Sequence, residues 1–408
     1  MSEPQKMLNA EEALELLLSH ARPLDEVEHI HTTHALGRVL AQSLVSGVTV
    51  PPLDNSAMDG YAVACADLNP GGETRLKVAQ RIPAGSVGHA LERGTAARIF
   101  TGASVPPGAD AVVMQEDCTP DGDEVVIRAT PKSGANIRRA GEDIIIGQEI
   151  LRAGVKMRPQ EMGLAASIGL ADIPVYRRLR VALFFTGDEI VMPGESLQEG
   201  EIYNSNRYTL LGLLEGMGCH VADFGIVPDS LDATVEVLDQ AWREADLIVT
   251  SGGVSVGEED HVKAAVARTG KLDMWKVAMK PGKPIAYGTV HDTPFIGLPG
   301  NPVSAFATFC LFVRPYILRC QGVEKVTPRS YWLPAAFEWH KPGKRREFVR
   351  ARLEARADGA LAVVIYPNQG SGVLTSVAWS EGLAEIREGS TVARGDAIRF
   401  TPFSELLG

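Results

Sequence analysis

The segment DLIVTSGGVSVGEED, residues 246–260, decides the fold of this chain. A short apolar run, 246–250, leads into a glycine-rich turn, and an acidic stretch follows at the start of an expected helix, 258–268. A buried strand followed by a glycine turn and a helix is typical of a parallel α/β sheet. We therefore take this segment as the centre of an α/β domain and work outward from it.

The flanking sequence repeats the same alternation of strand and helix. The apolar runs predict strands at 180–185, 221–227 and 294–298 and helices at 206–217, 231–244 and 302–318. This spacing predicts βαβ crossovers and a mainly parallel sheet within residues 178–327.

The rest of the chain has a different character. Residues 51–146 alternate short apolar runs with Gly/Pro turns, which predicts a small β domain, and residues 328–408 return to a β pattern that predicts a C-terminal β-barrel-like domain. Residues 1–50 and 147–177 are expected to form an N-terminal helix, with Asn9 as its N-cap, and a linking α+β region. The fold class is thus multidomain α/β plus β, with the parallel-sheet domain at its centre.

Composition narrows the class of protein. The 408 residues hold 40 Lys and Arg against 51 Asp and Glu, a net charge of −11, which argues against generic nucleic-acid binding or docking to an anionic membrane. The five cysteines form no C-x-x-C pair, as expected of a reduced, cytoplasmic protein. No apolar run approaches the ~18 residues of a membrane span, because the best candidate, 305–313, stops at Arg314. Glycine is abundant, with 41 residues, which indicates many turns and close backbone approaches.

The expected strand ends share a chemical signature. In open parallel sheets, ligands bind outside the carboxyl ends of the strands. Here those ends are TGDE (186–189), PDS (228–230) and the glycine turn at 250–257. Glycine turns before helices bind anions, and neighbouring carboxylates tolerate a phosphate only with a divalent cation between them, so the pattern predicts Mg²⁺. Taken alone, Asp229 and Ser230 are better explained as helix caps than as ligand-binding residues.

Two further segments carry candidate anion-binding groups. Lys276, Lys280 and Lys283 are spaced along a stretch stiffened by two prolines and a glycine, which predicts a rigid cationic loop; a solvated lysine turn is the plainer alternative. The segment GLPGNPVS, 297–304, predicts an anion-ready helix start, with Asn301 as the N-cap and Pro302 in the first turn.

Other features carry less weight. His29, His31 and His34 have no further ligand cluster nearby, and the basic stretch 341–356 lacks the interleaved aromatic residues of an RNA-binding surface. In the β domain, the segment 54–56 suits an Asx turn and the segment 138–143 suits a surface ion-pair cluster. The sequence contains no P-loop, no G-x-G-x-x-G and no G-x-S-x-G motif.

Taken together, these segments resemble the molybdopterin molybdenumtransferases, the family of bacterial MoeA proteins and the E domain of gephyrin. The segments that carry the resemblance are DNSAMDGYA (54–62), RIFTGA (98–103), RRAGED (138–143), TGDE (186–189), TSGGVSVGEEDHVK (250–263), MKPGKP (279–284), LPGNPVS (298–304) and REFVRA (346–351). The resemblance implies an enzyme that takes adenylylated molybdopterin and molybdate as substrates, uses Mg²⁺, inserts molybdenum and releases AMP.

The resemblance also implies roles for individual residues. The catalytic set it implies is Asp59, Thr101, Asp143, Glu189 and Asp260, and the metal ligands are Glu189, Asp229 and Asp260. The substrate-binding set is Asp229, Ser251, Gly252, Gly253, Ser255, Lys276, Lys280, Lys283, Pro299, Pro302, Ser304, Arg350 and Ser371. Within that set, Ser304, Arg350 and Ser371 are expected to form a small oxyanion pocket.

The family resemblance further implies a homodimer whose active-site cleft uses both subunits, with an adenylyltransferase and molybdoenzyme maturation proteins as possible partners. Two alternatives stay open. Molybdopterin adenylylation is disfavoured by the additional β regions, and a non-catalytic pterin-binding scaffold is disfavoured by the complete acidic and lysine motifs.

Overall fold

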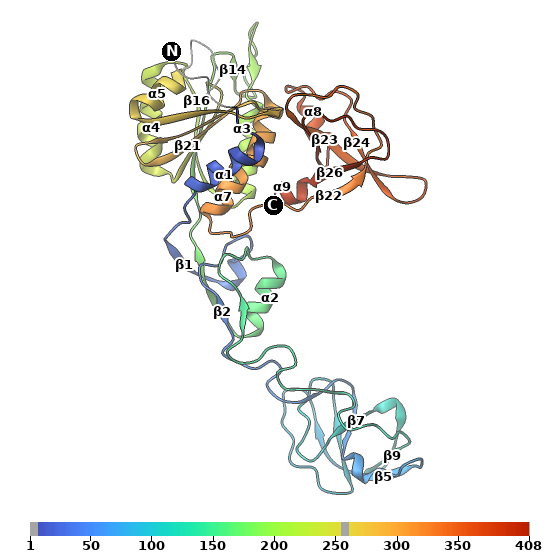
Figure 1. Cartoon of the computed structure of the whole chain (residues 1–408). Coiled ribbons are helices and arrows are strands. Elements are labelled where there is room, and N and C mark those ends of the chain that lie inside the picture. The colour runs from blue at the N-terminus through green and yellow to red at the C-terminus, as the bar shows by residue number, and fades with distance from the viewer. Residues whose placement is uncertain (1–6, 254–260, 408) are drawn as a thin grey trace.

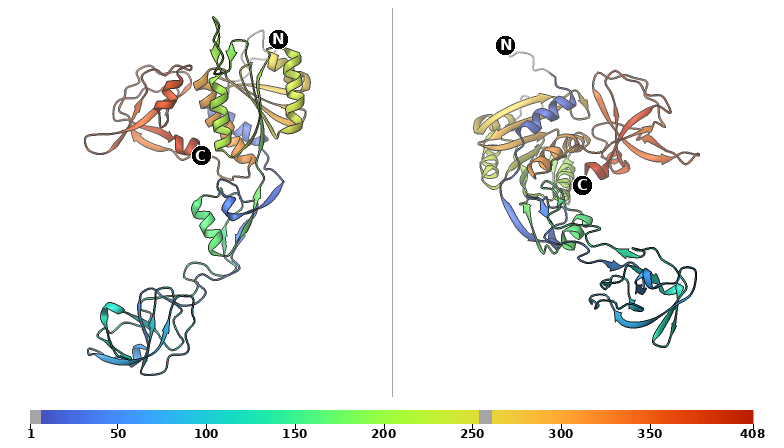
Figure 2. Two further views of the ribbon diagram at one scale, coloured as in Figure 1. Left: turned by 180° about the vertical axis from the view of Figure 1, so that it is seen from behind. Right: turned by 60° about the horizontal axis from the view of Figure 1, so that its bottom comes forward.

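The computed structural model describes residues 7–253 and 261–407. Figure 1 shows an elongated molecule in which a central α/β region and the C-terminal β region lie side by side. A narrow linking region leads from them to a second β region at the far end, and the two views in Figure 2 show the same arrangement. The multidomain α/β plus β architecture expected from the sequence is confirmed.

The central sheet has six strands in the order β16-β13-β17-β21-β20-β18. These strands are β13 (Arg180–Thr186), β16 (His220–Val227), β17 (Leu247–Ser251), β18 (Gly270–Lys276), β20 (Pro284–Val290) and β21 (Thr293–Leu298). The first four in the sheet order are parallel neighbours, whereas β20 runs antiparallel to both of its neighbours. The parallel half, which carries the strand-end motifs, was predicted; β18 and β20 were not.

Helices cover both faces of this sheet. Alternate residues of β13 point to opposite faces, so that Leu183 belongs to one core cluster and Phe184 to another. On the Phe184 side lie α4 (Leu231–Glu244) and α5 (His261–Thr269). On the Leu183 side lie α1 (Ala10–His20), α3 (Ser205–Gly216) and the helical segment 302–320. Asn9 caps α1 with a capping box, as the sequence predicts.

The helical segment 302–320 agrees with the helix predicted at 302–318, but it extends well beyond the apolar run 305–313 that was considered as a membrane span. It consists of α6 (Pro302–Thr308), a π-helical turn (Phe309–Val313) and α7 (Arg314–Cys320). By length and composition this 19-residue helix is apolar enough to cross a membrane, so the expectation that no such segment exists is wrong. However, 89% of its apolar window is buried inside the protein, where it forms part of the core beside α1 and α3.

The distal β region is a six-stranded sheet in the order β7-β4-β6-β5-β9-β8. Its strands are β4 (Gly60–Val63), β5 (Thr74–Ile82), β6 (Thr95–Ile99), β7 (Ala111–Met114), β8 (Cys118–Asp121) and β9 (Glu124–Ile127). The chain enters and leaves it through two neighbouring segments, which are joined by the antiparallel pair β2 (Leu44–Val45) and β11 (Glu149–Leu151) and by a bridge between Val50 and Ile144.

The linking region and the C-terminal region complete the chain. The linking region contains β1 (Val27–His31), which pairs with β12 (Asp172–Tyr176), and α2 (Pro159–Ser167). The C-terminal sheet contains β22 (Tyr331–Pro334), β23 (Arg346–Ala355), β24 (Leu361–Ile365), β25 (Gly382–Ile386) and β26 (Ala397–Pro402). It also includes β19 (Met279–Lys280), a short strand that comes from within the central region. Two short helices, α8 (Leu374–Trp379) and α9 (Phe403–Leu406), lie beside this sheet.

Asp246 joins the linking region to the central sheet. Its carboxylate lies 2.6 Å from Arg177 Nη1 and 2.9 Å from Arg180 Nη2. Burial alone would raise the pKa of Asp246, but the hydrogen bonds from the two arginines and from the Arg180 backbone N–H lower it to about 2. A carboxylate with a lowered pKa stabilises the folded state above its ordinary pKa, and this stabilisation is lost as the pH falls.

We therefore expect Asp246→Asn to destabilise the protein by about 2 kcal/mol at pH 7, and the difference from the unmodified protein to shrink as the pH falls from about 4 toward 2. Urea unfolding of both proteins across this pH range measures the effect. A difference that stays constant with pH would contradict the assigned charge state.

Candidate functional site

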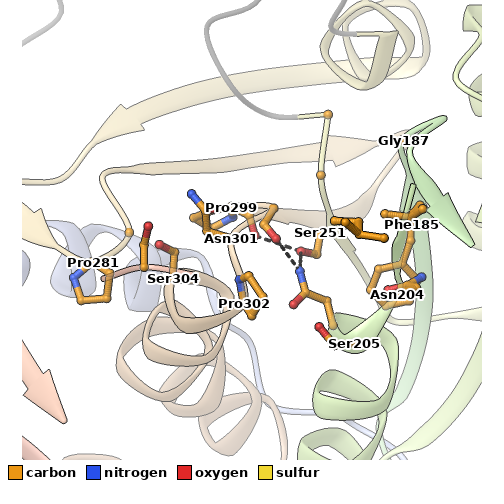
Figure 3. A pocket seen from close by; sticks show the side chains of 18 of the residues that line it. Phe185, Gly187, Asn204, Ser205, Ser251, Pro281, Pro299, Asn301, Pro302 and Ser304 are labelled. Atoms are coloured by element: carbon orange, nitrogen blue, oxygen red, sulfur yellow. Dashed lines mark hydrogen bonds between the residues drawn. The ribbon is translucent and has the colours of Figure 1, made fainter. Parts of the chain in front are cut away.

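A cavity of about 800 Å³ opens at the carboxyl ends of β13, β17 and β21. Its volume suits a small-molecule ligand. Figure 3 shows the starts of α3 and α6 meeting the strand-end turns at this cavity. The lining segments are 185–187, 189–190, 202–206, 251–253, 280–283, 299–302 and 369–371, together with Asp229, Ser304 and Arg345. This cavity therefore lies at the sheet edge where the strand-end motifs predict a ligand site.

One asparagine connects three of the lining segments. Asn206 Nδ2 donates to Ser251 Oγ at 3.0 Å and to the Gly300 carbonyl at 2.7 Å, and Ser251 Oγ donates to the Pro299 carbonyl at 2.9 Å (Figure 3). This network holds the start of α3, the glycine turn and the LPGNP turn together. Sequence reasoning missed Asn206 because a polar residue at an expected helix start gives no sign of its long-range partners.

The glycine turn after β17 needs glycine at two positions. Gly252 has φ +105° and Gly253 has φ +62°, which L side chains rarely adopt. A Cβ on Gly252 would lie 2.6 Å from the Thr186 carbonyl oxygen, so the turn and the end of β13 are in close contact. The buried Thr186 Oγ1 has no hydrogen-bond partner among the described residues. The turn thus presents backbone to the cavity, as an anion-binding loop does.

The predicted acids of the central region separate into two groups. Glu189 and Asp229 both line the cavity, and Ser230 beside them caps α4 by accepting from the Ala233 N–H at 3.3 Å. The capping alternative therefore applies to Ser230, while Asp229 is at the cavity. Asp260 and Ser255 lie outside the described residues. Within the described ranges, no cluster of three or more His, Cys, Asp or Glu side chains suited to a metal is found. His29, His31 and His34 therefore form no such cluster there.

The three lysines do not form the single loop that was predicted. Lys276 is the last residue of β18 and is not among the cavity-lining residues. Lys280 belongs to β19, and Lys283 follows the next turn; both line the cavity. The stretch is not one loop because Lys276 ends β18, where it pairs with Pro284, and Lys280 lies in β19; spacing alone does not reveal either pairing. Arg345 also lines the cavity and was missed, because it lies one residue before the REFVRA motif and the basic stretch 341–356 was otherwise weighed as an RNA contact.

The LPGNP turn brings Pro299, Pro302 and Ser304 to the cavity, as expected. Asn301 is the N-cap of α6 by backbone conformation, but its side chain makes no capping hydrogen bond. The predicted N-cap position is therefore confirmed, without a side-chain hydrogen bond, and Asn301 also lines the cavity.

The C-terminal region contributes the remaining wall. Ser371 lines the cavity, and its carbonyl accepts a hydrogen bond from the Val303 N–H at 3.0 Å. Arg350 is only 1% exposed and does not line the cavity. Its guanidinium lies behind the wall, where it donates to Ser376 Oγ at 3.0 Å and to the Gly370 carbonyl at 3.2 Å. Burial lowers the pKa of Arg350 to about 10.

The candidate residues of the distal β region lie far from this cavity within one chain (Figure 1). Thr101 donates to Asp59 Oδ1 through both its backbone N–H, at 2.8 Å, and its hydroxyl, at 2.7 Å. These hydrogen bonds lower the pKa of Asp59, which is therefore a partly exposed, ionised carboxylate. The backbone N–H of Asp143 donates to the Val50 carbonyl at 3.1 Å, where the chain leaves the distal β region. The Asp59–Thr101 contact is the one pairing of predicted catalytic residues in this region.

The segment 138–143 was predicted to form a surface ion-pair cluster, but its Arg139 pairs with a residue outside the segment. Arg139 pairs with Asp54 at 2.5 Å, while the Glu142 carboxylate accepts the Arg139 backbone N–H at 3.0 Å. Asp54 also accepts the Ala140 N–H at 2.8 Å. The contact therefore joins two of the sequence motifs, 54–62 and 138–143.

An α/β sheet with glycine turns, carboxylates and lysines at one cavity, extended by two β regions, defines an anion-binding enzyme domain with accessory modules. Three family descriptions match the chain in order: "MoeA N-terminal region (domain I and II)" over residues 8–169, "Probable molybdopterin binding domain" over 182–319 and "MoeA C-terminal region (domain IV)" over 333–403. The chain belongs to the MoeA family of molybdopterin molybdenumtransferases.

Individual relatives agree with this assignment. The molybdopterin molybdenumtransferase of Haemophilus influenzae is 38% identical over 98% of this chain and 100% of its own length. Molybdopterin molybdenumtransferase 2 of Mycobacterium tuberculosis is 40% identical over 87% of this chain and 90% of its own. A crystal structure of the molybdopterin biosynthesis MoeA protein of Pyrococcus horikoshii is 30% identical, covers 97% of this chain and 100% of its own, and superposes with a TM-score of 0.85.

Proposed function

We propose that this protein is a transferase of molybdenum cofactor biosynthesis that inserts molybdenum from molybdate into adenylylated molybdopterin and releases AMP. The observation that carries the proposal is the single cavity at which two carboxylates, a glycine turn and two lysines meet. An adenylylated substrate carries a pyrophosphate, and molybdate is a tetrahedral oxyanion. Both need concentrated positive charge and backbone donors in a protein whose net charge is −11.

Residues of this chain supply the backbone donors and the positive charge on different sides of the cavity. The turn at Gly253 and the start of α3 offer backbone N–H groups to phosphate oxygens, whereas the Gly252 N–H already donates to the Leu298 carbonyl at 3.2 Å. Lys280, Lys283 and Arg345 offer cationic donors on the opposite side, near Ser304 and Ser371. The phosphates thus belong at the glycine turn, and molybdate belongs between the lysines and the serines. This arrangement would stabilise negative charge as it develops on the departing AMP phosphate.

The donor set also suits Mg²⁺. Glu189 and Asp229 are hard oxygen ligands at the cavity, and Mg²⁺ is commonly bound by one or two carboxylates together with substrate phosphates and water. Asp260, which lies outside the described residues, would be a third ligand by family resemblance. Bound there, Mg²⁺ would act as a Lewis acid on a phosphate oxygen.

The proposal includes a homodimer in the cytoplasm. Within one chain, Asp59 and Thr101 are far from the cavity, so a catalytic role for them requires that a second subunit bring its distal β region to the cleft (Figure 1). Partner proteins that supply adenylylated molybdopterin or receive the finished cofactor fit the same proposal. We do not expect nucleic-acid or membrane partners.

The test is AMP release from adenylylated molybdopterin by the purified protein with Mg²⁺. We expect release that requires molybdate and does not consume ATP, because the substrate is already adenylylated. Sulfate, which has the same charge and shape as molybdate but delivers no metal, is the matched control and should not give a finished cofactor. ATP consumption without a molybdate requirement would instead indicate an adenylyltransferase, and the absence of any turnover would indicate a scaffold. Asp260→Asn should lower the release.

A further inference from the structure

The strand that carries Lys280 belongs to the C-terminal sheet. β19 pairs in parallel with β23, so that Lys280 is opposite Glu347 and Met279 is opposite Arg346. Neighbouring contacts strengthen this join: the Arg346 N–H donates to the Ala278 carbonyl at 2.9 Å, and Arg345 Nη1 donates to the Met279 carbonyl at 3.3 Å. The backbone around β19 is thus held by three consecutive residues of the C-terminal region, 345–347.

Glu347 fixes the side chain as well. Its Oε2 atom lies 3.1 Å from Lys280 Nζ, and the side chains are 10% and 46% exposed, respectively. The carboxylate is therefore buried on the protein side of the ion pair, while the ammonium stays accessible at the cavity. An ammonium has three N–H donors, so Lys280 can keep its contact with Glu347 and still donate to an anion in the cavity.

We infer that Glu347 is a positioning residue that holds the Lys280 ammonium at the wall where molybdate binds. The inference rests on the proposed function, which places the oxyanion beside Lys280. A lysine side chain has about four rotatable bonds and loses much rotamer freedom when it binds a ligand. Glu347 restricts that freedom before the ligand arrives, which is a general way of gaining affinity.

The position of the charge also matters. Glu347 brings a negative charge close to an anion site, which by Coulomb's law opposes anion binding. The inference therefore separates two effects of this side chain, a favourable one from holding Lys280 and an unfavourable one from its charge. Glutamine retains the hydrogen-bond acceptor and removes the charge, whereas alanine removes both, so the two variants respond differently.

The experiment measures the equilibrium dissociation constant for molybdate by calorimetry on the full-length protein. We expect Glu347→Ala to weaken molybdate binding about fivefold to tenfold, in the range of couplings between groups in contact. Glu347→Gln should bind within about twofold of the unmodified protein, because the amide oxygen still accepts the hydrogen bond from Lys280. In a Lys280→Met background, Glu347→Ala should no longer weaken molybdate binding, and loss of the Glu347 charge should leave the affinity equal or slightly higher.

Glu354→Ala is the matched control, since it removes an exposed ion pair with Arg352 from the same strand and should leave molybdate binding unchanged. Equal affinity of Glu347→Ala and the unmodified protein, or the same loss with and without Lys280, would overturn the inference. If Glu347→Ala does not fold, Glu347→Asp retains the charge on a shorter arm and should weaken binding; unchanged binding there would also overturn it. Failure of the unmodified protein to bind molybdate would instead refute the proposed function.

Discussion

Replacing Glu189 by Gln is expected to slow AMP release by about a hundredfold, the usual cost of removing one group that stabilises charge at a reacting centre. Glu189 lies just beyond β13 and lines the cavity. Its carboxylate is folded back over the turn, since a Cβ on Gly187 would lie 2.6 Å from Glu189 Oε2. Glutamine has nearly the same size but no charge, so the expected loss arises from removal of the proposed metal ligand and not from packing.

Single-turnover release of AMP at several Mg²⁺ concentrations measures this effect. A ligand role predicts that the variant needs more Mg²⁺ to reach half of its maximal rate. Glu195→Gln is the matched control, because Glu195 is exposed in the same connection between β13 and α3 but does not line the cavity. It should release AMP at the unmodified rate. Unchanged release by Glu189→Gln at low Mg²⁺ would contradict the role assigned to Glu189.

Replacing Gly252 by Ala is expected to disrupt both stability and substrate binding. The positive φ of Gly252 disfavours any L side chain, and the new Cβ would meet the Thr186 backbone carbonyl, which is not free to move within β13. Strain of this kind costs about 1–3 kcal/mol. Relief of the strain requires the glycine turn to move away from β13, which would displace the proposed phosphate donors.

Thermal unfolding and AMP binding together test the Gly252 prediction. Gly212→Ala is the matched control. Gly212 lies within α3, and a Cβ there meets nothing within 4 Å. Alanine at this position should stabilise the protein by about 0.5–1 kcal/mol, because glycine is a poor helix former. An unfolding temperature of Gly252→Ala equal to that of the unmodified protein, with unchanged AMP affinity, would show that the turn tolerates a side chain.

The sequence predicts the parallel half of the central sheet because local signals agree there. Helix α4 begins and ends where expected, since Ser230 provides a side-chain cap and the apolar positions follow a helical period. Strand β17 is a continuous apolar run that ends in glycine, and both signals are visible within a few residues. The same agreement places Glu189, Asp229 and the glycine turn at one edge of the sheet.

Features that depend on distant partners could not be predicted in this way. Strand β19 has two residues and exists only because β23, far along the chain, pairs with it. The burial of Arg350 depends on Ser376 and Gly370, and the role of Asn206 depends on Ser251 and Gly300. None of these contacts leaves a periodic or local pattern in the sequence, so Arg350 was expected at the cavity and Asn206 was not.

The pairing of β19 with β23 limits how this protein can diverge or be recombined. A chimera that takes its C-terminal region from a relative would also import the neighbours of Lys280, including whatever residue replaces Glu347. Such a hybrid could fold with every catalytic motif intact and still handle its oxyanion differently. Exchange of whole C-terminal regions therefore also exchanges residues that shape the cavity. Substitutions at positions 345–347 and 278–280 should be tolerated best when they occur together.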